Sequence, residues 1–132
     1  MHFQAFQRTK DILSSSPVLC HFSPTAETAL HTDGSRLKGL GFCLMQRHSI
    51  EDPWSIVICG SRFLSDVEAR YATTEIELLA VLWAAQKCSL YLLGLPRVSL
   101  LVDHQPLLPI INTKSLEQIH NPRLFRLSLI HI

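Results

Sequence analysis

Residues 74–80 read Thr-Glu-Ile-Glu-Leu-Leu-Ala, and at this stretch the apolar pattern of the chain changes from the period of strands to the period of a helix. From residue 73 or 74 to about residue 92, apolar side chains occupy two neighbouring stripes of one helix. So wide an apolar surface predicts a helix that is buried on more than one side. Gly94 ends this helix, and Pro96 prevents its continuation.

Three strands are predicted before this helix and one after it. Residues 28–33, 39–46 and 55–60 have the composition of strands, and their short connections predict an antiparallel meander. Residues 97–103 form a further β-rich run, which we expect to lie parallel to the first strand because a helical crossover joins the two. The predicted fold class is therefore α/β, with a mixed sheet of three antiparallel strands followed by a helix crossover to a parallel strand.

Shorter elements are predicted at both ends of the chain. Residues 3–14 have helical spacing, and residues 1–25 are expected to form a lead-in helix and a connector. A short helix is expected at residues 106–111, and residues 26–132 are expected to form the main domain. We expect this domain to be truncated at its C-terminus, because the amphipathic stretch at residues 122–132 stops without a cap or a polar tail.

The composition narrows the class of protein without deciding its function. The chain has 132 residues, of which 47% are apolar and 17% charged, so it can form one domain with an ordinary core and is not disordered. A net charge of +1 argues against a polybasic protein that binds nucleic acid indiscriminately. The chain shows no signal peptide and no apolar stretch of transmembrane length, so we expect an intracellular, soluble protein with no membrane partner. Its four cysteines lack metal-ligand spacing, and we expect buried free thiols.

Three carboxylates stand beside or inside strongly apolar runs. They are Asp33 in His31-Thr-Asp-Gly-Ser35, Glu77 in the helix, and Asp103 in Leu101-Val-Asp-His104. A carboxylate near a core is costly unless hydrogen bonds, a cation or a metal ion compensate it. Asp103 also follows a predicted parallel strand, and open α/β sheets place ligand chemistry at the carboxyl ends of such strands. Together the three carboxylates suggest a shared divalent cation.

Each carboxylate also has a structural interpretation. Asp33 fits an Asx-turn, Asp103 fits a cap of the short helix that follows it, and Thr74-x-x-Glu77 has the spacing of a capping box. Small residues three, four and seven positions after Glu77 favour the metal site instead, because they let the helix approach the sheet closely. Glu75 lies about 200° around the helix from Glu77, so we expect it to be solvated.

Taken in order, these segments resemble the ribonuclease H domain of reverse transcriptases from long-terminal-repeat retroelements of the Ty3/gypsy type. The resemblance runs from about Phe6 to Leu129 and rests on several blocks. These are His31-Thr-Asp-Gly-Ser35, Ser61-Arg-Phe-Leu-Ser65 with Glu68 and Tyr71, Thr74-Glu-Ile-Glu-Leu-Leu-Ala80, Tyr91-Leu-x-Gly94, Val102-Asp-His-x-x-Leu107 and Asn121-Pro-Arg-Leu124. The chain departs from the family pattern at Gly34, where the family motif has alanine, and at Val102, where it has threonine.

The resemblance implies a ribonuclease H-like fold and two-metal hydrolysis of the RNA strand of RNA–DNA hybrids. It implies that Asp33, Glu77 and Asp103 are the catalytic residues and the ligands of Mg²⁺, or of Mn²⁺ in its place. Asp33 would bridge the two ions.

The resemblance also implies contacts and partners beyond the metal ions. Ser35, Arg62 and His104 are the residues expected to contact substrate. The partners expected are the RNA–DNA hybrid and the reverse transcriptase and integrase domains of a Pol polyprotein. Such a protein is expected in the cytoplasm, where it can belong to virus-like particles, or in the nucleus.

The alternative is a catalytically inactive retroelement remnant that acts as a structural or nucleic-acid-binding module. The family carries a fourth acidic residue in a C-terminal A-D-x-L-S-R element, which this sequence does not contain, and the low net charge also favours a remnant. Retention of all three acidic positions favours the nuclease. An integrase-like nuclease with the same fold would not explain the blocks at residues 61–65 and 91–94.

Overall fold

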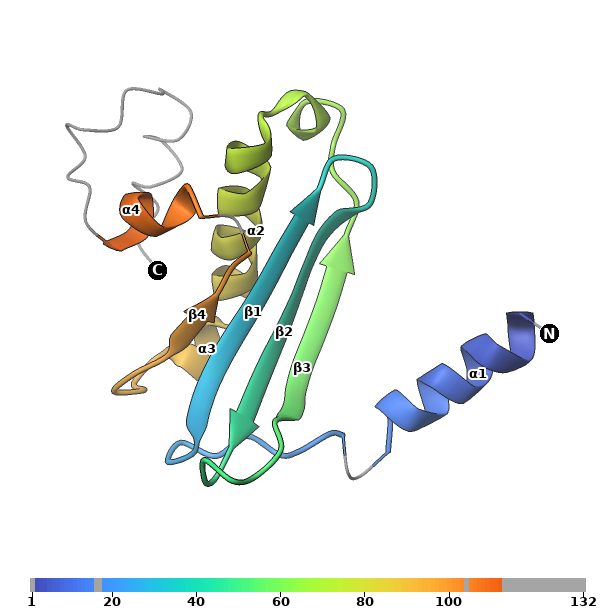
Figure 1. The fold of residues 1–132 in the computed structure, drawn as a ribbon, viewed down its shortest axis with the longest axis vertical. Coiled ribbons are helices and arrows are strands. Elements are labelled where there is room, and N and C mark those ends of the chain that lie inside the picture. The colour runs from blue at the N-terminus through green and yellow to red at the C-terminus, as the bar shows by residue number, and fades with distance from the viewer. Residues whose placement is uncertain (1, 16–17, 104, 113–132) are drawn as a thin grey trace.

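The computed structural model describes residues 2–15, 18–103 and 105–112 (Figure 1). In chain order the elements are α1 (His2–Leu13), β1 (Glu27–Ser35), β2 (Gly39–Arg47), β3 (Ser55–Arg62), the 3₁₀ turn η1 (Glu68–Arg70), α2 (Thr73–Lys87), α3 (Ser89–Leu92), β4 (Ser99–Leu101) and α4 (Leu107–Asn112). The amphipathic stretch predicted at residues 122–132 lies outside the described residues.

The strands form one mixed sheet in the order β3-β2-β1-β4. β2 is antiparallel to both β1 and β3, whereas β4 lies parallel to β1 after the chain has crossed over through α2. A β-bulge interrupts the β2–β3 register, since Leu44 pairs with Ile58 and Met45 pairs with Ile56. The predicted fold class, α/β with three antiparallel strands and a parallel one, is confirmed.

α2 lies across one face of the sheet and carries most of the core (Figure 1). Its alanines bring the helix close to β1 and β2, while its opposite side packs against α4. The buried clusters are Leu30, Phe42, Leu44, Ala84, Ala85 and Cys88; Leu40, Ile76 and Ala80; and Leu78, Leu82 and Leu107. The prediction of a helix buried on more than one side is confirmed.

Three predicted boundaries were wrong. The helix expected to reach residue 92 breaks at Cys88, whose φ of −92° and ψ of 4° are not helical, and α3 follows the break. β4 has three residues instead of seven, because Val102 leaves the sheet to pack against the cluster between α2 and α4. Gly34 and Ser35 continue β1 instead of turning, and the chain reverses just before Gly39, whose φ is 92°.

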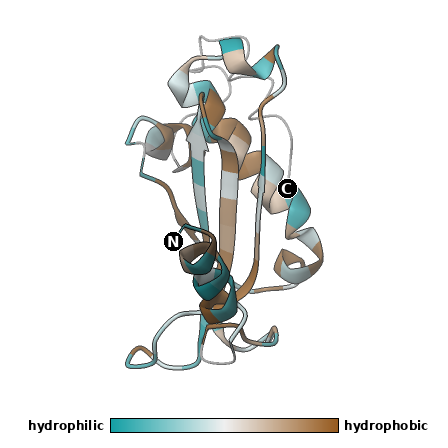
Figure 2. Cartoon of the chain, turned by 90° about the vertical axis from the view of Figure 1, so that its right-hand side faces the viewer, coloured by the Kyte–Doolittle hydropathy of each residue, from teal (hydrophilic) through white to brown (hydrophobic). Residues whose placement is uncertain are grey.

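α1 projects away from the sheet, and none of its residues is buried (Figure 1). Hydrophilic and hydrophobic residues are mixed along it (Figure 2), and its hydrophobic side chains Phe3, Phe6, Ile12 and Leu13 are exposed. The connector after α1 joins the edge of β3, where the Cys20 N–H donates to the Ile56 carbonyl at 2.9 Å and the Ile56 N–H donates to the Val18 carbonyl at 2.7 Å. The division into residues 1–25 and 26–132 stays a prediction.

Among the described helices, none combines the length and the apolar character that crossing a lipid bilayer requires.

Candidate metal centre

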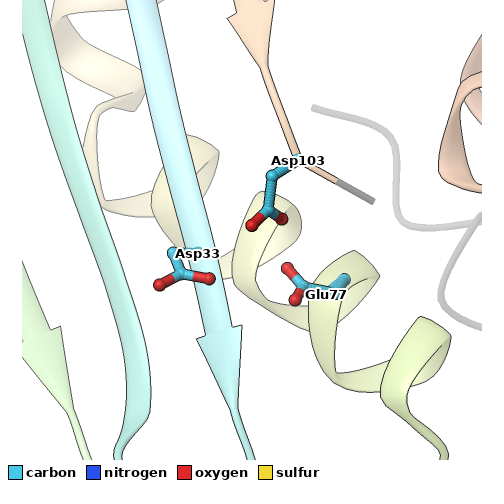
Figure 3. Close-up of side chains that lie close together, drawn as sticks. All are labelled: Asp33, Glu77 and Asp103. Carbon is cyan, nitrogen blue, oxygen red and sulfur yellow. The ribbon is translucent and has the colours of Figure 1, made fainter. Parts of the chain in front are cut away.

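Three carboxylates from three elements converge at one edge of the sheet. Asp33 lies on β1, Glu77 lies in the N-terminal part of α2, and Asp103 lies two residues after β4. Their side chains point toward one another (Figure 3), and one ligand oxygen from each lies within 4.8 Å of the others. The structure thus brings together the three residues that the sequence singled out as metal ligands.

The strand register explains why the two aspartates meet. β1 and β4 are parallel neighbours, and His31 pairs with Leu101 in their register. Asp33 and Asp103 each follow this pair by two residues. In a parallel pair, residues at the same offset stay side by side, so both carboxylates emerge at the same edge of the sheet.

Glu77 is held against β1 by a backbone hydrogen bond. The Gly34 N–H donates to Glu77 Oε2 at 3.1 Å. The backbone around Gly34 is packed so closely on α2 that a Cβ at this position would lie 3.0 Å from the carbonyl oxygen and from a side-chain methyl of Ile76. The absence of a side chain at Gly34 therefore sets the approach of the helix that carries Glu77.

The three carboxylates form a site of concentrated negative charge. Asp33 and Asp103 are exposed, whereas Glu77 is only 6% exposed. Burial first, and then the charges of Asp103 and Asp33, raise the pKa of Glu77 to about 7, although the Gly34 N–H opposes the rise. Within the described residues, neither of the two ion pairs involves any of these carboxylates. The site therefore has the chemistry of a cation site.

The capping alternative for Glu77 is wrong, and so is the expectation that Glu75 is solvated. α2 begins at Thr73, so Ala72 occupies the N-cap position and Glu75 is the third helical residue. The Glu75 Oε2 atom accepts the Ala72 N–H at 2.8 Å, and Glu75 is buried at 3% exposure. Because Glu75 makes this capping bond, the carboxylate of Glu77 is left to the site.

The structural alternatives for the two aspartates also fail. Asp33 lies within β1 and pairs with Gly41, so its backbone is extended and does not begin a turn. Asp103 is separated from α4 by three residues, because that helix begins at Leu107. Neither aspartate therefore occupies the local position that its structural interpretation required.

Of the three residues predicted to contact substrate, two lie within the described residues. Ser35 ends β1, two residues beyond Asp33, and is half-buried. The guanidinium of Arg62 binds both carboxylate oxygens of Glu68, at 2.7 and 2.9 Å, and its centre lies 5.5 Å from the centroid of the Trp83 ring. His104 lies outside the described residues, and the substrate contacts of all three stay predictions.

Sequence reasoning missed the role of Glu68 in shaping this end of the molecule. Glu68 accepts the Ser65 N–H at 2.9 Å, and the Ser65 Oγ accepts the Glu68 N–H at 3.2 Å. The bidentate bond from Arg62 is the main cause that lowers the pKa of Glu68 to about 2. The spacing Ser65-x-x-Glu68, which is that of a capping box, was the available signal. This network fixes the loop that leads into α2.

The sheet order, the crossover helix and the converging carboxylates define a ribonuclease H-like domain. A family model described as an RNase H-like domain found in reverse transcriptase matches residues 1–100, and the chain belongs to this family. The match includes Asp33 and Glu77 and ends before Asp103.

Curated relatives are polyproteins of transposons. The chain is 35% identical over 103 residues to the retrovirus-related Pol polyprotein from transposon gypsy of Drosophila melanogaster, covering 78% of this chain and 9% of that protein. It is 36% identical over 104 residues to the Pol polyprotein from transposon opus of the same species, covering 79% and 10%. It is 31% identical over 127 residues to the transposon Tf2-3 polyprotein of Schizosaccharomyces pombe, covering 96% and 9%. The chain therefore spans about a tenth of the length of these relatives and is an RNase H-like domain of retrotransposon Pol type.

Proposed function

We propose that this chain is a ribonuclease H domain that hydrolyses the RNA strand of RNA–DNA hybrids, with divalent metal ions held by Asp33, Glu77 and Asp103. The observation that carries the proposal is the convergence of these three carboxylates within 4.8 Å at one edge of the sheet. Membership of the family of RNase H-like domains found in reverse transcriptase supports the reaction class.

The residues present fit a divalent metal ion. All three donors are hard carboxylate oxygens, which suit Mg²⁺ and also Mn²⁺. After burial, which is the largest cause, the charges of Asp103 and Asp33 also raise the pKa of Glu77, and a bound cation would offset this repulsion. When bound, the ions supply an activated water and stabilise the leaving oxygen of the phosphodiester.

The protein's own contribution is to fix the positions of the donors. Glu77 is oriented by the N–H of Gly34 and shielded from solvent, so its carboxylate is the least free of the three. Asp33 and Asp103 are exposed at the mouth of the site, where a bound hybrid would meet them. Asp33, which lies on the strand between β2 and β4, would hold the ions together with Glu77 and Asp103.

Substrate contacts are proposed for Ser35, Arg62 and His104. Ser35 lies on the same strand as Asp33 at an even spacing, so both residues belong to one face of the sheet. Arg62 has five N–H donors, and some of them bind the Glu68 carboxylate and the Phe63 carbonyl. We propose that its remaining N–H groups bind a phosphate. Selection of the RNA strand is proposed to depend on its 2′-hydroxyl groups.

We further propose that the chain acts beside reverse transcriptase and integrase domains of a Pol polyprotein, inside the cell. The relatives are polyproteins of which the matched segment is about a tenth, which supports this context.

The test is cleavage of a hybrid whose RNA strand is labelled, in Mg²⁺ and separately in Mn²⁺, by the 132-residue chain. The expected result is cleavage that disappears in Asp33→Asn and Asp103→Asn but persists in Glu75→Gln, a buried glutamate on the same helix that caps α2. Circular dichroism shows whether each variant is folded. If the folded chain cleaves the hybrid neither in Mg²⁺ nor in Mn²⁺, the proposal is contradicted. Retained binding of the hybrid would then favour the structural or nucleic-acid-binding module.

A further inference from the structure

The four cysteines differ in exposure, so the expectation that all are buried thiols was wrong. Cys88 is buried at the end of α2, Cys20 and Cys43 are partly buried, and Cys59 is exposed. Cys59 is thus the thiol most open to reagents in solution.

Cys43 and Cys59 are directly opposite each other in the antiparallel β2–β3 pair. Directly opposite residues in such a pair have Cα atoms about 4.5–5.5 Å apart, and their side chains project from the same face of the sheet. A disulfide needs Cα atoms about 4.4–6.8 Å apart. The backbone register therefore already satisfies the main geometric requirement of a disulfide.

The flanking residues show which face carries the two thiols. Phe42 and Leu44, on either side of Cys43, are both buried in the core cluster under α2, so Cys43 belongs to the opposite face. Burial raises the pKa of the Cys43 thiol, and the neighbouring Cys59 raises it further. Cys59 is the more accessible of the two.

Cys43 also shares a surface hollow with the carboxylate site. A shallow hollow of about 130 Å³ is lined by Cys43, Gly41 and Phe42 of β2 and by His31, Thr32 and Asp33 of β1. Chemistry at Cys43 would therefore take place beside Asp33. The pair and the carboxylates are nevertheless separate groups of side chains.

We propose that Cys43 and Cys59 are a dithiol that closes reversibly to a cross-strand disulfide by exchange with a low-molecular-weight disulfide such as glutathione disulfide. This modification site does not depend on nuclease activity, since it needs only the register of β2 and β3.

The exchange takes place in two steps that conserve atoms and electrons. The Cys59 thiolate attacks one sulfur of glutathione disulfide, so a mixed disulfide forms on Cys59 and one glutathione thiolate leaves and takes up a proton. Cys43 then loses its proton to solvent and attacks the Cys59 sulfur, which releases the second glutathione. Two electrons pass from the protein dithiol to glutathione disulfide, and two glutathione molecules are produced.

Closure would link the outer strand β3 covalently to β2. The disulfide would span the β2–β3 turn and the bulge at Leu44 and Met45, and would leave every strand in its register. A cross-link of this loop length constrains the unfolded chain, so the oxidised protein is expected to melt roughly 5–10 °C higher than the reduced protein.

The first test is peptide mapping of the folded wild-type chain after incubation with glutathione disulfide and alkylation of the remaining thiols. Trypsin cleaves after Lys38, Arg47 and Arg62, so Cys43 and Cys59 fall on the separate peptides 39–47 and 48–62. The expected product is a monomer in which these two peptides are joined and two hydrogens are lost, and dithiothreitol should separate them.

Two variants distinguish this pair from other thiol chemistry. Cys43→Ser is expected to stop at the glutathione adduct on Cys59, and it should show no rise in melting temperature. Cys20→Ser removes a thiol outside the pair and is expected to cross-link as the wild type does. The proposal is overturned if the folded wild type accumulates the Cys59 adduct without joined peptides. It is equally overturned if the peptides are joined only in covalent dimers or only in denaturant.

Discussion

Removing the charge of Glu77 should stabilise the metal-free protein. In Glu77→Gln the side chain keeps its shape, and its amide oxygen can accept the Gly34 N–H that now binds Glu77 Oε2 at 3.1 Å. Burial, followed by the charges of Asp103 and Asp33, raises the pKa of Glu77 from its usual 4.5 to about 7. Since one pKa unit corresponds to about 1.4 kcal/mol, the ionised carboxylate lowers the free energy of unfolding by up to about 3 kcal/mol above pH 7.

The raised pKa also fixes the direction of the pH dependence. The folded carboxyl group binds its proton more tightly than the unfolded one, so the stability that this proton contributes is present below pH 4.5 and is lost as the pH rises through about 7. Urea unfolding in EDTA, repeated at several pH values from about 4.5 to about 8, measures this loss. We expect the free energy of unfolding of Glu77→Gln to exceed that of the wild type by about 1–3 kcal/mol at the highest pH and to equal it at the lowest pH.

Magnesium should reverse the order of stability of the wild type and Glu77→Gln. An ion that binds only the folded site stabilises the wild type by mass action, whereas Glu77→Gln has lost a ligand and should gain less. Glu75→Gln is the matched control, because Glu75 caps α2 instead of facing the cluster, and it should keep the wild-type response to Mg²⁺. The reasoning is refuted if Glu77→Gln is less stable than the wild type in EDTA at high pH, or if it gains as much from Mg²⁺.

Four further substitutions test other parts of the structure. Thr32→Val should raise the free energy of unfolding in urea by about 1 kcal/mol, because Thr32 Oγ1 is buried without a partner among the described residues. Thr28→Val should lower the free energy of unfolding, because the Thr28 hydroxyl donates to the Ala26 carbonyl and accepts a hydrogen bond from the side-chain amide of Gln46. Glu68→Gln should lower the free energy of unfolding by about 1–3 kcal/mol at pH 7. Because the pKa of Glu68 is lowered to about 2, thermal melts should show the difference between variant and wild type shrinking as the pH falls from 4.5 toward 2. Gly34→Ala should raise the Mg²⁺ concentration at which half of the metal-dependent stabilisation is reached. The reason is that the new Cβ would lie 3.0 Å from Ile76 and push α2 away from β1, and an unchanged midpoint would contradict this.

The frame of the fold was predictable because it depends on periodicity. The change from strand period to helix period at residue 73 gives the crossover, and the crossover requires β4 to be parallel to β1. The three carboxylates were predictable because each interrupts an apolar run. The register that brings Asp33 beside Asp103 follows from these two facts together.

The roles of Glu75 and Glu77 were harder to assign, because a shift of two residues in the start of the helix exchanges them. Threonine is a commoner N-cap residue than alanine, so the sequence left open a cap at Thr74 with Glu77 as its partner. In the fold Ala72 is extended and precedes the helix, and the carboxylate of Glu75 reaches back to its N–H. Local propensity does not decide between these starts, since the loop before α2 is fixed by contacts made elsewhere.

Arg62 illustrates the same limit for a charged side chain. In the sequence it stands as a free cation beside a strand, available to a phosphate. In the structure it meets Glu68 because the 3₁₀ turn folds that residue back toward the end of β3. An interaction that depends on the geometry of an irregular turn has no periodic signal in the sequence.

The parallel pairing of β4 with β1 has a consequence for the order of events in folding. Asp103 follows Asp33 by about seventy residues, and it reaches the other two carboxylates only after β4 has paired with β1 through three residues. The cluster is therefore absent from any intermediate that contains only the hairpins and α2. A metal ion that binds the cluster acts on the completed domain, so it slows unfolding and leaves the early folding rate unchanged.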